Sequence, residues 1–223
     1  LHPRVRRQRQ MCIRDSFYAK EGFVSVALSW IVLSIFGALP FYFSGEIPLF
    51  EDALFEVISG FTTTGASVLS DVESLSRCML MWRSFTHWIG GMGVLVFILA
   101  VLPLAGGYNM HIMRAESPGP SVGKLVPRVK LTAKILYVIY FSMTVLQILI
   151  LLLSGMPWFD SLAMSFGTAG TGGFGILNSS CGSYTTFQQA VFTIFMILFG
   201  INFNVYYLFL IKKPKDALHC EEM

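Results

Sequence analysis

Four long apolar runs constrain the fold of this chain more than any other feature of its sequence. They cover roughly Phe23–Phe43, Met79–Leu104, Ile135–Leu153 and Phe187–Ile211. About 20 helical residues cross the roughly 30 Å hydrocarbon core of a bilayer, since each residue adds about 1.5 Å. Backbone groups in lipid must be hydrogen-bonded within the protein, so each run is expected to be a helix. The sequence therefore predicts an all-α membrane protein with four spans.

The distribution of charge predicts how these spans are oriented. Only 13% of the residues are charged, against about 25% in an ordinary soluble domain. Most of the 16 Lys and Arg residues fall in three blocks, at 1–20, 110–134 and 212–215, whereas 45–76 and 155–186 contain none. The positive-inside rule places the basic blocks and both termini on the cytoplasmic side of a bacterial inner membrane. Because the blocks alternate with apolar runs, membrane lipid is the expected partner, and nucleic acid is the weaker interpretation.

Two short glycine-containing loops, 62–66 and 170–174, recur 108 residues apart. Each follows an apolar stretch that is too short to cross a membrane, Ala53–Phe61 and Ser161–Gly167. Such stretches are expected to be re-entrant half-helices, which enter the membrane and stop part of the way through. The chain is thus predicted to contain two tandem copies of a unit made of a helix, a pore half-helix, a filter loop and a second helix.

An aspartate precedes each half-helix, at Asp52 and Asp160, in each case 13 residues before a glycine of the loop. An acidic residue favours a helix N-terminus, because it interacts well with the positive end of the helix dipole. The opposite end, which carries partial negative charge, then points towards the glycine loop. This orientation favours a cation at the loop.

The two loops have the residue types of an ion filter. A dehydrated monovalent cation needs several oxygen ligands at once, and backbone carbonyls with threonine hydroxyls supply them. Glycine permits the backbone angles that direct successive carbonyls to one axis. Ordinary turns between helices remain the alternative for each loop alone, but the repeat favours a filter. The candidate ion-binding residues are Thr62, Thr63, Thr64, Gly65 and Ala66 in the first loop, and Gly170, Thr171, Gly172, Gly173 and Phe174 in the second.

The sequence gives little support for an enzyme. Gly170, Gly172 and Gly175 match the spacing of a dinucleotide-binding fingerprint, but that motif needs a strand before it and a helix beginning within it. Here an apolar half-helix precedes the glycines, and a polar loop follows at 176–184. The histidines and cysteines are scattered, and no nucleophile–base set or metal-ligand spacing is present. We therefore expect no enzyme activity and no cofactor, with potassium at the filter loops as the only metal.

A few residues within the apolar runs also indicate helix packing. Arg83 and His87, four positions apart, share a face of the second run and are expected at an interface or in the bundle interior. The glycines of Gly90–Gly93 would let another helix approach closely. Asn202 and Asn204 in the fourth run should face protein or a water-filled pore, and interhelical hydrogen bonding and pore lining are equally open for them.

Taken together, these motifs resemble the Trk/Ktr/HKT superfamily of potassium transporters, and most closely the bacterial Trk-type membrane subunit. The resemblance implies a fold of four repeats arranged pseudo-fourfold around one pore, in which each repeat gives one filter segment. It further implies potassium uptake, with possible symport, a homodimer and a cytoplasmic nucleotide-binding regulatory subunit. Glycine at the positions of Gly65 and Gly173 goes with potassium in this superfamily. The matching segments are ISGFTTTGAS (58–67), HWIGGMGVLVFILAVLP (87–103), MRAESPGPS (113–121), KLVPR (124–128), SFGTAGTGGFG (165–175) and ILFGINFNVYYLFL (197–210).

This chain carries two such repeats, and we expect it to be a piece of a longer reading frame. The expected division is an artefactual segment at 1–16, a first repeat at 17–109, a cytoplasmic linker at 110–130, a second repeat at 131–211 and a cytoplasmic tail at 212–223. One alternative is a two-repeat potassium channel that dimerises to complete its pore. A purely structural membrane scaffold is a further alternative.

Overall fold

The computed structural model describes residues 19–93, 129–201, 203, 205 and 206, and these form helices and loops without a strand. The all-α class expected from the apolar runs is thereby confirmed. Asn202 and Asn204, the linker 110–128 and the segments 1–18 and 207–223 lie outside the described residues. The helices, in chain order, are α2 (Ala19–Ser44), α3 (Phe50–Phe61), α4 (Arg77–Met92), α7 (Val129–Leu153), α8 (Trp158–Ala169) and α9 (Thr186–Gly200).

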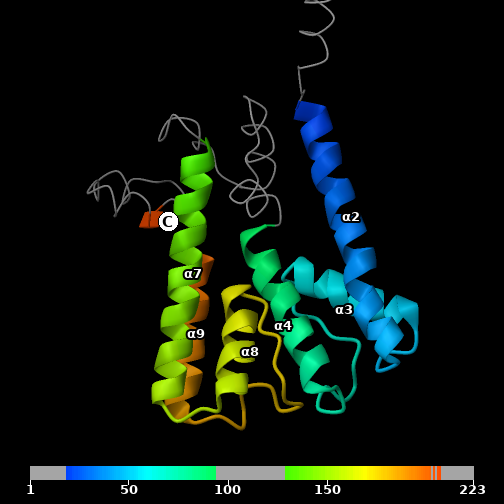
Figure 1. Cartoon of the computed structure of the whole chain (residues 1–223). Coiled ribbons are helices and arrows are strands. Elements are labelled where there is room, and N and C mark those ends of the chain that lie inside the picture. The colour runs from blue at the N-terminus through cyan, green and yellow to red at the C-terminus, as the bar shows by residue number, and fades with distance from the viewer. Residues whose placement is uncertain (1–18, 94–128, 202, 204, 207–223) are drawn as a thin grey trace, which may run out of the picture.

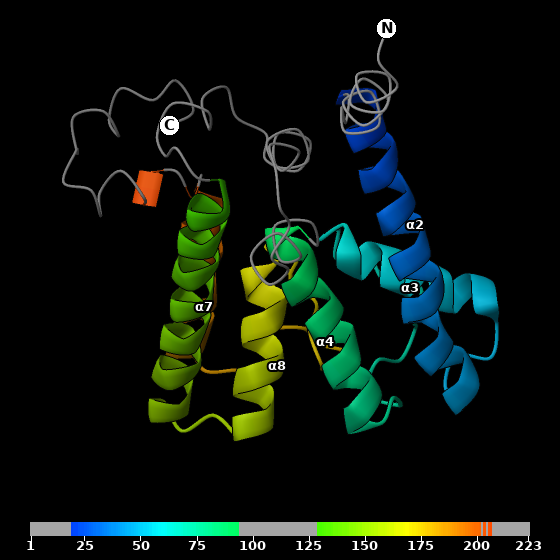
Figure 2. The same cartoon turned by 45° about the horizontal axis from the view of Figure 1, so that its top comes forward.

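The six helices form two groups of three that lie side by side (Figure 1). In the first group α3 packs against α2 and α4, and in the second α8 packs against α7 and α9. The groups meet where α4 packs against α8, as Figure 2 shows from a second direction. Each group therefore contains a short helix between two neighbours, and the contact of α4 with α8 brings the ends of the two short helices towards each other.

Two of these helices are long and apolar enough to cross a membrane, over Ala27–Ser44 in α2 and Lys134–Leu153 in α7. Helix α9 is a shorter apolar helix, and α4 ends at its C-cap Gly93. The predicted second and fourth spans continue to Leu104 and Ile211, and those continuations lie largely outside the described residues. Many large apolar side chains on α2 and α7 are exposed, among them Phe36 and Leu146, as expected for surfaces that face lipid.

The helix ends differ from the predicted ones by a few residues. Helix α2 begins at Ala19 rather than Phe23, and α7 begins at Val129 rather than Ile135. The apolar runs exclude the charged residues before them, such as Lys20 and Lys130, although lysine is a good helix former. The helices therefore extend beyond the apolar segments that identified them.

Close packing at two glycines of α4 holds this helix against both short helices, as the glycines of Gly90–Gly93 predict. A Cβ atom at Gly90 would overlap the carbonyl oxygen of Phe61, the last residue of α3. A Cβ at Gly91 would overlap the Tyr140 hydroxyl and lie only 3.1 Å from the carbonyl oxygen of Ala169, the last residue of α8. Glycine is thus required here so that α4 can touch the C-terminal ends of both short helices.

Candidate functional site

The two short helices end in the same way, and each leads directly into one of the two loops, 62–66 and 170–174, that the sequence predicts to be filter loops. The amide of Thr62 donates to the Ile58 carbonyl (2.8 Å), and the equivalent amide of Gly170, 108 positions later, donates to Phe166 (3.3 Å). Each helix thus places its last carbonyls, which carry partial negative charge, beside its loop. Helix α3 begins at Phe50 and α8 at Trp158, so Asp52 and Asp160 lie inside the first turns and not before the helices, where the sequence predicted them. Both are still near the N-terminal end of the helix dipole.

The backbone conformation of the two loops also repeats. Thr63 and Thr171 have φ angles of 55° and 59°, and Gly65 and Gly173 have φ angles of 75° and 78°. The Thr63 amide donates to Gly60 (3.0 Å), as the Thr171 amide donates to Thr168 (2.8 Å). A β-branched residue with positive φ is uncommon because its side chain crowds the backbone. Two threonines held in this conformation at equivalent positions indicate that the loop geometry serves a function.

The two loops touch each other through their backbones. A Cβ atom at Gly65 would overlap the carbonyl oxygen of Gly172, and a Cβ at Gly172 would lie 2.6 Å from the carbonyl oxygen of Thr63. Side chains are therefore excluded from this contact, and carbonyl-bearing backbone from both loops lies within one small region. Oxygen atoms gathered in this manner can replace part of the water around a dehydrated cation.

The side chains of the loops divide into two kinds. Thr62, Thr64 and Thr171 are exposed, and the Thr62 hydroxyl lies 2.8 Å from that of Thr64. The Phe174 side chain is instead only 1% exposed, so any contribution of this residue to an ion site would come from its backbone. The carbonyl of Ala66 accepts a hydrogen bond from Ser59 (2.5 Å), whereas at the equivalent place in the second unit Gly167 lets the Phe174 carbonyl approach closely.

A buried ion pair lies behind the loops. The Glu56 carboxylate in α3 accepts a hydrogen bond from the Nε of Arg83 in α4 (2.5 Å), and their side chains are 0% and 4% exposed. Arg83 was predicted at an interface or in the interior, and it lies in the interior. Its partner Glu56 was missed, although it is the one acid of α3 beyond the first turn. An acid inside an apolar half-helix was the signal that could have identified it.

His87, which lies one turn after Arg83, is fully buried beside the second loop. Its ring meets the Phe174 ring edge-on, with 4.3 Å between the ring centroids. A Cβ atom at Gly170 or at Gly172 would overlap the His87 side chain. The residues of the second loop therefore pack directly on α4 of the first unit.

The segments that follow the filter loops are tied together by Asn178. Its Oδ1 accepts from the Val72 amide (2.7 Å) and its Nδ2 donates to Asp71 (2.7 Å), while its own amide donates to Glu73 (2.9 Å). These three bonds link the loop before α4 to the loop before α9. The two units are thus held together at the filter loops and again at the loops beyond them.

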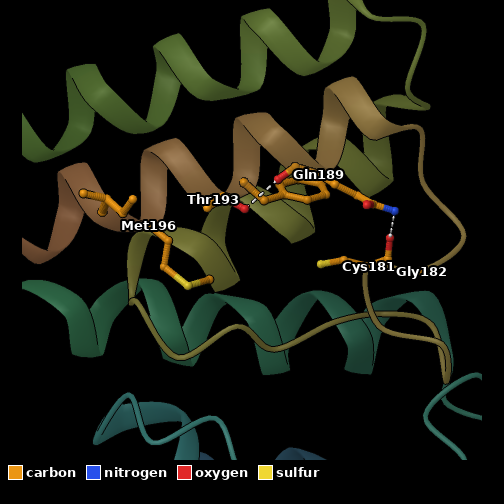
Figure 3. Close-up of a pocket in the computed structure, with 7 residues that line it drawn as sticks. Cys181, Gly182, Gln189, Thr193 and Met196 are labelled. Atoms are coloured by element: carbon orange, nitrogen blue, oxygen red, sulfur yellow. Dashed lines mark hydrogen bonds between the residues drawn. The ribbon is translucent and has the colours of Figure 1, made fainter.

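A cavity of about 500 Å³ opens beside α9, on the far side of the second loop from α4 (Figure 3). Ser76 caps α4 and Thr185 caps α9, and aligning the two caps pairs Arg83 with Phe192 and His87 with Met196. Phe192 and Met196 both line the cavity. The face of α9 that borders it therefore corresponds to the face of α4 that holds a filter loop.

Comparisons with known proteins show the family of this chain. Residues 6–221 match the family model of TrkH, a cation transport protein. The Trk system potassium uptake protein TrkH of Salmonella typhimurium is 41% identical over 192 residues, which cover 85% of this chain and 40% of that protein. TrkG of Escherichia coli K12 is 38% identical over 202 residues, or 89% of this chain and 42% of that protein.

A solved structure is similar as well. The potassium transporter TrkH from Vibrio parahaemolyticus superimposes with a TM-score of 0.69 at 33% identity, over 86% of this chain and 38% of that one. This chain therefore spans about 40% of the length of the curated relatives that it matches.

Proposed function

Because the chain belongs to the TrkH family of cation transport proteins, we propose that it forms part of a potassium pathway through a bacterial inner membrane. The observation that carries this proposal is the pair of loops, whose four positive-φ residues fall at equivalent positions and whose backbones touch. Unrelated turns have no reason to repeat such strain in register. A shared requirement for ordered carbonyl groups accounts for both loops.

The chemistry of the site suits a monovalent cation. Both half-helices end at the loops, and each helix C-terminus carries about half an elementary negative charge. Thr62, Thr64 and Thr171 are exposed residues of the loops, and their hydroxyl groups would add neutral oxygen ligands. Neutral carbonyl and hydroxyl groups bind potassium while allowing it to leave again, which conduction requires. Thr62–Ala66 and Gly170–Phe174 would be two segments of the filter, with Gly65 and Gly173 at its centre.

The remaining segments of the filter would come from further units of the same polypeptide. The cavity beside α9 supports this assignment, because Phe192 and Met196 occupy the positions at which Arg83 and His87 hold a filter loop. A third loop placed there would repeat the contact between α4 and the second loop. A second copy of this chain is the alternative occupant, as in the dimeric two-repeat channel.

The sidedness and the partners of the subunit complete the proposal. The loops 45–76 and 155–186, which lack basic residues, would face outwards, and the basic segments with both termini would face the cytoplasm. The family resemblance adds a homodimer and a cytoplasmic nucleotide-binding regulatory subunit. Symport with a second ion follows from the same resemblance.

A chimaeric transporter tests the proposal. In this protein, called the transport chimera below, the matching segment of the Escherichia coli relative, 40% of that protein, is replaced by this chain. We expect it to restore growth at low potassium in a strain that lacks potassium uptake. A Gly65→Leu variant should fail, because its side chain would overlap the Gly172 backbone. Restored growth that Gly65→Leu leaves unchanged would contradict the proposal, as would no growth from a chimera present in the membrane.

A further inference from the structure

We propose that the Glu56–Arg83 ion pair is a positioning pair, which fixes the two filter loops relative to each other and thereby sets the preference among monovalent cations. This inference rests on the proposed function, since it concerns the same loops. Its basis is that the pair contacts the segment directly after the first loop and, at the second loop, both Phe174 and the adjoining Gly175. Neither residue belongs to a loop, and neither is required to touch the cation.

Glu56 holds the segment that leaves the first loop. Its carboxylate accepts hydrogen bonds from the Ser67 hydroxyl (2.9 and 3.1 Å) and from the Val68 amide (3.1 Å). Together with the bond from Arg83, these occupy both carboxylate oxygens. The chain just after Ala66 is thus anchored to α3, the same helix that leads into the loop.

Arg83 holds the second loop by two different interactions. Its Nη1 donates to the Gly175 carbonyl (2.8 Å), and its guanidinium carbon lies 3.6 Å from the centroid of the Phe174 ring. A guanidinium can stack on a ring and donate several bonds within its plane, whereas a lysine ammonium cannot reproduce that geometry. The geometry therefore requires arginine, and a positive charge alone would not suffice.

In the second unit, apolar residues stand at the positions that correspond to the ion pair. Met164 stands 108 positions after Glu56, and Phe192 occupies the position of Arg83 when the helix caps are aligned. Both are buried apolar residues. Apolar side chains of similar volume often pack as stably as a buried ion pair, which is costly to desolvate. Apolar side chains would lack the directional hydrogen bonds of the pair, which end on Ser67 and Val68 just after the first loop and on Gly175 just after the second.

Cation preference should respond to these bonds, because it depends on how the filter carbonyls are spaced and how far they can move. Releasing Gly175 or Val68 would let one loop shift against the other at the contact between Gly65 and Gly172. The filter would then adapt more readily to cations of other sizes. A change in preference, rather than only a lower rate, is the expected consequence.

The test compares Glu56→Gln and Arg83→Lys with Arg77→Gln in the transport chimera. Arg77 lies at the start of the same helix and faces the Phe159 ring of α8 at 5.6 Å, so it is a matched control. Rubidium and sodium competition against potassium uptake gives the preference, and membrane abundance is measured in parallel. We expect each Glu56 or Arg83 variant to change a preference ratio by about threefold or more, at the lower end of what residues acting through others contribute. Arg77→Gln should leave the ratios unchanged.

A second measurement does not depend on transport. Hydrogen–deuterium exchange on the purified chimera should be faster at residues 62–68 and at 170–176 in both variants, and unchanged in Arg77→Gln. Lower uptake with unaltered ratios, or faster exchange in only one loop, would overturn the positioning role. If the unaltered chimera transports no cation, the proposed function fails, and the exchange result still decides whether the pair holds both loops.

Discussion

Gly65 and Gly173 share one backbone conformation but differ in what surrounds them. At a φ near 75°, an alanine costs about 1–2 kcal/mol more than glycine at either position. At Gly65 a Cβ atom would also overlap the Gly172 backbone, whereas at Gly173 it would meet only the Met196 side chain, at 3.6 Å. Gly65→Ala should therefore abolish potassium uptake by the transport chimera, and Gly173→Ala should reduce it in part. Uptake of the potassium analogue rubidium, normalised to membrane abundance, measures both.

The relative size of the two losses of uptake tests the contact between the loops. Backbone strain alone predicts equal losses, because the two φ angles are nearly the same. A larger loss in Gly173→Ala would contradict the contact between the loops. An equal and complete loss would mean that another segment crowds Gly173 as closely as Gly172 crowds Gly65.

Individual residues of the site were predictable from sequence to different degrees. The loop glycines and threonines could be identified because their types and spacing repeat, and the structure places them in matching conformations. Glu56 could not be assigned to Arg83, because 27 positions separate them and the pairing depends on how α3 packs against α4. The burial of Phe174 also depends on α4, which lies more than 80 positions earlier in the chain. Local pattern identifies a loop, whereas packing decides which of its atoms are exposed.

At the scale of the helices, the close approach of α4 to α3 depends on glycine at Gly90 in α4 as well as at Gly60 in α3. A Cβ at Gly90 would overlap the Phe61 carbonyl and lie 3.0 Å from that of Gly60, and backbone cannot move aside as a flexible side chain can. Gly90→Ala should therefore destabilise the transport chimera by about 1–3 kcal/mol, as overpacking usually does. Thermal unfolding in detergent, followed by the loss of soluble monodisperse protein, measures the change.

Gly200 provides the matched control for this substitution. It is the last residue of α9, and a Cβ there would meet nothing within 4 Å. Gly200→Ala should be neutral or stabilising by up to about 1 kcal/mol, since alanine favours a helix more than glycine does. If Gly90→Ala unfolds at the same temperature as Gly200→Ala, then α3 and α4 do not touch as the structure places them.

The helices themselves were the most predictable part of the fold. The short helices were recognisable because an aspartate precedes a short apolar stretch that leads into a glycine-containing loop, and α3 and α8 cover these stretches but begin three residues earlier. Their packing partners were not predictable, because apolar faces in a membrane protein give no local sign of which helix they contact. The bonds that identify the partners are single polar contacts, such as Tyr140 to the Trp88 carbonyl (2.9 Å).

At the scale of the whole molecule, the two units are joined asymmetrically. Helix α4 holds the filter loop of the next unit, whereas the equivalent face of α9 borders a cavity lined by Phe192 and Met196. A closed ring would cover every such face with a loop from the following unit. In the proposed potassium pathway, covering this face of α9 is the step that would make the two loops part of a pore.

Two cysteines allow the proposed covering of α9 by a following unit to be measured. Cys181 lines the cavity and is partly exposed, whereas Cys78 is exposed at the start of α4, away from it. With Cys12 and Cys220 replaced by serine and no other cysteine present, a membrane-impermeant maleimide should label Cys78 from outside intact cells in every case. Cys181 should be labelled when the chain is expressed alone and protected in the transport chimera, where a following unit covers α9. Equal labelling of Cys181 in both proteins would contradict that covering, and labelling of Cys78 only after the cells are opened would reverse the proposed sidedness.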